Sequence, residues 1–167
     1  IGNLLFNCSR AVKNKQDIIV FVKNKRFFSE GIIVDGKRCK IKLSYDFFIK
    51  VLDVLESGKR PQGGVSEYKN GIPSLGGEHI GLNGKIKITK DNLKFVPNIF
   101  FDKSTQGKLK NGDILICKDG ALTGKVALFN ETELPFNQSM INEHVFLLRS
   151  NNEVSQSYLF HLLFSKN

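Results

Sequence analysis

Closely spaced glycines restrict the fold of this chain more than any other feature of its sequence. The segment SGKRPQGG, residues 57–64, holds three glycines and Pro61, so it cannot form a helix or a central strand. From Gly71 onward, short apolar runs alternate with glycine-containing turns. Runs of this length, bounded by such turns, are typical of short strands. The sequence therefore predicts an α+β fold with mostly antiparallel short strands and a few helices.

Three elements are expected before this loop. A β-branched run, an Asp-Gly turn between two strand-like runs, and apolar residues at helical spacing are their respective signals. They are a strand over 17–22, a hairpin of 31–34 with 37–43 around Asp35-Gly36, and a helix over 45–56 capped by Ser44.

After the loop, the pattern predicts more strands and a final helix. In the run 85–90 lysines alternate with Ile86 and Ile88, so the two isoleucines should face one side of a strand. In a strand over 141–149, the neighbours Glu143 and His144 should point to opposite faces. The expected elements are strands over 85–90, 112–118, 124–129 and 141–149, with a turn at Asp119-Gly120, and a helix over 154–165.

The charge balance points to a polyanionic partner. The chain has 25 Lys plus Arg against 16 Asp plus Glu, a formal net charge of +9. Residues 1–60 carry 13 basic and six acidic side chains, and residues 85–110 carry seven lysines against two aspartates. A basic domain attracts nucleic acid through its field and through counterion release. A basic domain with no nucleic-acid role is the alternative from charge alone.

No catalytic, metal or cofactor site is evident. Cys8, Cys39 and Cys117 are scattered, and His79, His144 and His161 lack the close spacing of zinc ligands. The segment GALTGK at 120–125 is followed by Val126 where a phosphate-binding loop needs a hydroxyl. Cys117, within ILIC, is expected to be a buried, inert thiol.

The expected location is the cytoplasm. The cysteines are odd in number and scattered, which favours a reducing compartment. No secretory leader is recognised, and no apolar run approaches the roughly 18 residues of a membrane span. The chain opens at Ile1 rather than Met, so we expect it to be part of a longer polypeptide.

Five segments in a fixed order carry a family resemblance. Together, from about residue 50 to 166, they resemble a target recognition domain of a type I restriction-modification specificity subunit. The segments are VLDVLESGKRP (51–61), GIPSLGGEHI (71–80), GDILICKDGALTGKVAL (112–128), FNQ (136–138) and YLFHLLFS (158–165).

The resemblance implies a DNA reader without catalytic residues. It implies that residues 46–167 form a DNA target recognition domain, and that residues 1–45 are a basic N-terminal segment without a counterpart in the family. Its partners would be double-stranded DNA and the methyltransferase and restriction subunits that methylate and cleave it. A full subunit of this family joins two recognition domains by long helices, whereas this chain carries one.

Three other functions stay open on the sequence. The chain is alternatively the recognition region of a fused restriction-methylation enzyme, which its unmatched residues 1–45 favour. It is otherwise a small metal-dependent nuclease whose acidic residues converge only in space, or a protein-interaction module with a basic surface.

The candidate DNA-binding residues follow from side-chain chemistry. Lysine and arginine contact phosphate or guanine, and amides pair with adenine. Lys118 and Lys125 flank a glycine-containing reversal that suits a phosphate, and Ser74 and His79 lie in a glycine-flanked segment that can approach DNA closely. The cationic candidates are Lys59, Arg60, Lys85, Lys87, Lys118 and Lys125, and the amide candidates are Gln62, Gln138 and Asn142.

Overall fold

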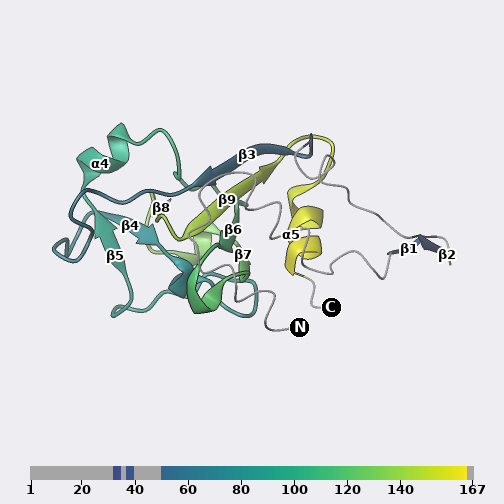
Figure 1. Ribbon diagram of the computed structural model, residues 1–167, viewed down its shortest axis with the longest axis horizontal. Helices are drawn as coiled ribbons and strands as arrows, with labels where there is room; N and C mark the ends of the chain where they lie inside the picture. Colours follow the sequence, from purple (N-terminus) through teal and green to yellow (C-terminus); the bar gives the residue numbers. More distant parts are fainter. Residues whose placement is uncertain (1–31, 35–36, 40–49, 165–167) are drawn as a thin grey trace.

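A computed structural model describes residues 32–34, 37–39 and 50–164 (Figure 1). Strands β1 (Ile32–Val34) and β2 (Lys37–Cys39) pair antiparallel, which confirms the expected hairpin. The expected strand over 17–22, the hairpin turn and residues 45–49 of the expected helix lie outside the described residues.

A four-stranded antiparallel sheet forms the centre of the molecule. Its order is β3-β9-β6-β7, so β9 lies between two strands that are distant from it in sequence. The pairs Leu115↔Leu147 and Ile114↔Leu128 set the register. The strands are β3 (Leu52–Ser57), β9 (Val145–Ser150), β6 (Ile114–Cys117) and β7 (Val126–Leu128).

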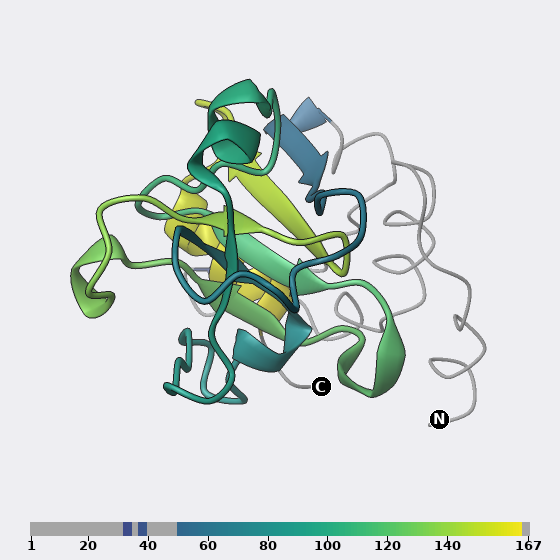
Figure 2. The same cartoon turned by 90° about the vertical axis from the view of Figure 1, so that its left-hand side faces the viewer.

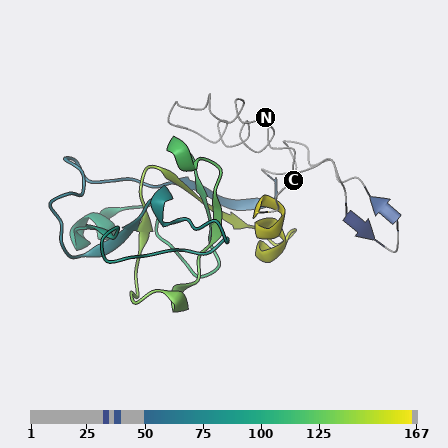
Figure 3. The same ribbon diagram turned by 90° about the horizontal axis from the view of Figure 1, so that it is seen from below.

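Both faces of this sheet are covered by other parts of the fold. Successive side chains of β6 point to opposite faces, so they enter two different core clusters. Ile114 and Ile116 pack with Leu159 and Leu163 of helix α5 (Gln156–Phe164). Leu115 packs on the other face, in a cluster with Leu75 from the second sheet. Helix α5 accordingly lies on the side of the central sheet away from β4 and β5 (Figures 1 and 3).

A three-stranded sheet covers the second face, in the order β5-β4-β8. The pair β4·β5 is antiparallel and the pair β4·β8 is parallel. Figure 2 views the molecule from this side. Gly71 opens β4 at φ +127°, and a Cβ there would lie 2.3 Å from the Val96 carbonyl oxygen. The strands of this sheet are β4 (Ile72–Leu75), β5 (Lys94–Val96) and β8 (Met140–Ile141), and helix α4 (Asn98–Lys103) follows β5. Three short 3₁₀ helices complete the described elements: η1 (Gly77–His79), η2 (Gly120–Leu122) and η3 (Glu131–Glu133).

The predicted α+β class is confirmed, with mostly antiparallel strands and few helices among the described residues. The expected strands at 112–118 and 124–129 are present as β6 and β7, and the final helix is present as α5. These three elements carry clear local signals, so their existence follows from the nearby sequence.

The helix predicted over 45–56 is wrong over residues 52–56, because residues 52–57 form strand β3; Lys50 is helical. Five positions of β3 pair with β9, including Leu55↔Leu148 and Ser57↔Phe146. These pairs satisfy the backbone and place Leu55 against the core. Tertiary pairing therefore overrides the helical spacing of the apolar residues.

The predictions at 85–90 and 141–149 also need correction. The first segment forms only an isolated bridge, Ile80↔Ile86, although Ile86 and Ile88 do pack against the core while Lys85 and Lys87 are exposed. The second divides into β8 and β9. A turn separates the two strands, in which the Asn142 side-chain oxygen accepts the His144 N–H at 2.9 Å and its carbonyl accepts the Val145 N–H at 3.2 Å.

An ion pair with a buried carboxylate joins the start of β6 to β9. Arg149 donates from Nε to Asp113 Oδ1 at 2.6 Å, and from Nη2 to Asp113 Oδ2 at 2.8 Å. Its Nη2 also donates to the Lys108 carbonyl at 2.9 Å, and Asp113 accepts the Lys110 N–H at 2.8 Å. Asp113 is 2% exposed. Hydrogen bonding to Asp113 raises the pKa of Arg149 above its ordinary value.

Replacing Asp113 by alanine should lower the free energy of unfolding by about 3 kcal/mol, because it leaves the guanidinium of Arg149, whose side chain is only 23% exposed, without its carboxylate. Glu133→Ala is the matched control, since it removes the exposed Lys85–Glu133 pair at 3.2 Å. That change should cost less than about 1 kcal/mol. Urea denaturation of the three proteins measures the difference, and equal losses in the two variants would contradict the structural role of Asp113.

Candidate nucleic-acid interface

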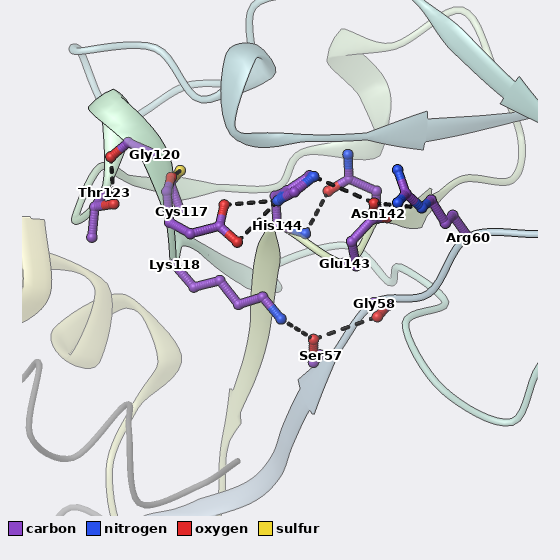
Figure 4. A network of polar contacts seen from close by, with 11 residues as sticks. Ser57, Gly58, Arg60, Cys117, Lys118, Gly120, Thr123, Asn142, Glu143 and His144 are labelled. Atoms are coloured by element: carbon purple, nitrogen blue, oxygen red, sulfur yellow. Dashed lines mark hydrogen bonds and ion pairs between the residues drawn. The ribbon is translucent and has the colours of Figure 1, made fainter. Parts of the chain in front are cut away.

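Three turns gather at one end of the central sheet. Since β9 is antiparallel to both neighbours, β3 and β6 end where β9 begins, at the pairs Ser57↔Phe146 and Cys117↔Val145. The chain segments that leave or enter the sheet here therefore lie together (Figure 4). We call residues 57–61, 118–125 and 142–144 the turn cluster.

Gly58 allows two of these turns to touch. Its N–H donates to the Val145 carbonyl at 3.3 Å. A Cβ at this position would lie 2.2 Å from the carbonyl oxygens of both Ile141 and Asn142. The Asn142 N–H in turn donates to the Leu75 carbonyl at 2.9 Å, which joins the cluster to the end of β4. Only glycine fits at position 58 without displacing the backbone.

A chain of contacts between ionisable side chains crosses the turn cluster (Figure 4). His144 Nδ1 lies 2.8 Å from Asp119 Oδ1, and His144 Nε2 lies 3.3 Å from Glu143 Oε1. The same Glu143 oxygen lies 2.9 Å from Arg60 Nε. The Arg60 side chain is 59% exposed, whereas that of Glu143 is 27% exposed. The contacts thus run from an inner carboxylate at the end of β6 to an outer guanidinium after β3.

This chain of contacts corrects one expectation. Glu143 and His144 lie in a turn rather than in a strand, so their side chains approach each other instead of pointing to opposite faces. Neither residue was among the candidates, nor was Asp119. The turn that brings them together depends on the Asn142 side chain and on the arrival of β9 between two distant strands, so spacing along the chain gives no signal for the group.

The Lys118 side chain points into the protein rather than to its surface. It is 7% exposed, its Nζ donates to Ser57 Oγ at 2.7 Å, and the ammonium lies 5.1 Å from the centre of the Phe146 ring. Lys125, at the other end of the reversal, is partly exposed. The two lysines therefore do not present a matched pair of ammonium groups, and the Asp119-Gly120 turn is extended by η2.

Cys117 is buried, as its sequence context predicts. Its Sγ lies against η1, where a Cβ on Gly77 would come within 2.4 Å of the sulfur. Burial raises the pKa of the Cys117 thiol to about 11, so the thiol is protonated near neutral pH.

His79 is fully buried and holds backbone groups together. The Gly76 N–H donates to its Nδ1 at 2.8 Å, and its Nε2 lies 2.9 Å from the Asn92 carbonyl. Since Nδ1 accepts, the proton resides on Nε2 of a neutral ring. Burial lowers the pKa of His79 below its usual value.

The other candidate DNA-binding residues fall into an interior group and a surface group. Ser74, 1% exposed, and Asn142, 9% exposed, are interior like His79 and Lys118. Lys85 is exposed and pairs with Glu133. The cationic and amide candidates at the surface are Lys59, Arg60, Gln62, Lys85, Lys87 and Gln138.

Metal-binding clusters and membrane-spanning helices are both absent from the described part of the chain. Among its residues, no group of three or more His, Cys, Asp or Glu side chains could hold a metal ion. No helix in the same residues is both long and apolar enough to span a bilayer.

Comparison with known proteins gives matches to solved structures. No family model and no curated protein matches the chain. One match is a chain from a structure that concerns complex assembly and conformational transition of the type I R-M system, with TM-score 0.46, 19% identity, and coverage of 68% of this chain and 25% of that chain. A second is the HsdS subunit from Thermoanaerobacter tengcongensis, with TM-score 0.46, 17% identity, and coverage of 68% and 25% respectively. The match thus spans a quarter of each solved chain.

His79→Gln should reduce the dependence of stability on pH. Because the folded pKa of His79 is lowered from 6.5, unfolding below that pH takes up a proton. Its contribution to stability is therefore complete above pH 6.5 and is lost as the pH falls. Between about pH 7.5 and about pH 5, the free energy of unfolding should fall more steeply for the wild type than for the variant. Urea titrations measure both slopes, and identical slopes would contradict the buried neutral ring.

Proposed function

We propose that this chain is the sequence-specific DNA-binding part of a type I restriction-modification enzyme, with residues 46–167 as its target recognition domain. The observation that carries the proposal is the turn cluster. Lys59, Arg60 and Lys125 there are exposed or partly exposed, on turns fixed by the ends of paired strands. Cations mounted on rigid turns suit the regularly spaced phosphates of a duplex.

Lys87 extends this basic surface beyond the turn cluster. Its N–H donates to the His79 carbonyl at 2.8 Å, and His79 ends the η1 helix that packs against Cys117. Lys59, Lys87 and Lys125 are the proposed phosphate contacts. Lys85 is left out because it pairs with Glu133 and follows Gly84, whose carbonyl accepts the Leu128 N–H at the opposite end of the central sheet. Gln62 and Gln138 are exposed amides that suit the edge of adenine.

In the proposed enzyme the interior candidates stabilise the fold and do not contact DNA. Ser74, His79, Lys118 and Asn142 are too buried to reach a duplex in this conformation. Methylation and cleavage would belong to cytoplasmic partner subunits, since a target base must be taken out of the stack by the subunit that modifies it. This chain would select the site and hold it in register.

Lys59→Ala, Lys87→Ala and Lys125→Ala should each weaken binding to all duplexes alike. Each should also reduce the slope of log affinity against log salt by about one, because one fewer phosphate is neutralised. Lys110→Ala is the matched control, since this exposed lysine precedes β6 at the end opposite the turn cluster. Fluorescence anisotropy over a salt series measures both quantities. Absence of duplex binding at low salt, or binding indifferent to salt, would overturn the proposed function.

A further inference from the structure

We propose that Arg60 reads guanine, and that Glu143 and His144 are positioning residues that orient its guanidinium. This inference rests on the proposed function and assigns a base to one side chain of the same surface. Its evidence is an exposed arginine in contact with a series of side chains that begins at Asp119, just after β6.

The contact with Glu143 leaves the recognition end of Arg60 outermost. The ion pair is made through Nε, 2.9 Å from Glu143 Oε1, which is the guanidinium nitrogen nearest the main chain. The amino groups Nη1 and Nη2 therefore lie at the far end of a side chain that is 59% exposed. Two parallel N–H donors at that end match the O6 and N7 acceptors of guanine in the major groove.

Glu143, which contacts Arg60, is itself linked to further residues. Glu143 Oε1 lies 3.3 Å from His144 Nε2, and His144 Nδ1 is bonded to Asp119 at 2.8 Å. The His144 N–H also donates to Asn142 Oδ1 at 2.9 Å, and its carbonyl accepts the Lys118 N–H at 3.0 Å. The chain of contacts thus ends on the sheet. An arginine restrained in this way loses less side-chain freedom when it binds.

The main chain of Arg60 is restrained as well. Gly58, two residues before it, is fixed by its close approach to Ile141 and Asn142. Pro61, directly after it, has a fixed φ and accepts the Gly64 N–H through its carbonyl at 3.1 Å. Lys59 shares this backbone but is not tied to Glu143, so it provides a natural comparison.

Electrostatics favour a base over a phosphate as the ligand of Arg60. Glu143 compensates much of the guanidinium charge and would repel a nearby phosphate. The neutral edge of guanine avoids that repulsion while using the same donors. Lys59 carries an ammonium without this carboxylate and suits a phosphate better.

Selection of bound sites from a randomised duplex pool tests the assignment with the 167-residue chain. The wild type should select guanine at a position where Arg60→Ala loses the preference, with discrimination there falling roughly 5- to 150-fold. Arg60→Lys should lose the same preference, because it keeps the charge but not the fork of donors. Lys59→Ala should bind all sequences more weakly and select the same site.

The positioning role needs separate variants. Glu143→Ala should weaken the guanine preference at the same position, and Glu143→Gln should restore part of it by keeping a side-chain oxygen beside Nε. His144→Ala should weaken the same preference and leave the others. Thermal unfolding of each variant confirms that it is folded, and a preference at every position that declines together with stability would overturn the positioning role.

The outcomes separate this inference from the proposed function. If the wild type binds no duplex, both fail. If it selects a site but Arg60→Ala keeps the guanine, or loses affinity uniformly as Lys59→Ala does, the guanine assignment fails while DNA recognition stands.

Discussion

The antiparallel pairing of β9 with both β3 and β6 is the constraint on which the remainder of the structure depends. These three strands come from distant parts of the chain and bury side chains on both faces of one sheet. At one end of β9 they bring the turn cluster together, and near the other end Arg149 fastens the start of β6 through Asp113. The surface that we propose for DNA therefore starts from the ends of the same strands that hold the core.

The sequence predicts those parts of the fold whose signals are local. Strands β6 and β7 follow from short apolar runs between glycines, and α5 follows from its helical spacing. Strand β3 has apolar residues that fit a helix equally well, and only its partner β9, nearly the whole described chain away, decides the outcome. The parallel contact between β4 and β8 is likewise invisible in either segment alone.

The candidate site shows the same division between local chemistry and distant packing. Side-chain type identifies Lys59, Arg60 and Gln62 in an exposed loop, where the structure also places them. The same reasoning singles out His79 and Lys118, whose polar groups instead bind Gly76 and Ser57 inside the fold. A glycine-flanked polar residue has two uses, contact with a ligand or contact with a neighbouring backbone. Burial decides between them, and burial is a property of the assembled sheets.

Two glycines define how the loop between β3 and β4 can vary. Gly58 and Gly71 both lie where a Cβ would collide with a carbonyl oxygen of a neighbouring strand or turn, so the chain leaves and re-enters the sheets at fixed points. The intervening residues, 59–70, are exposed or partly exposed and contribute few groups to the core. Changes in the length or composition of residues 59–70 would therefore leave the backbone at both glycines, and the sheets behind them, in place.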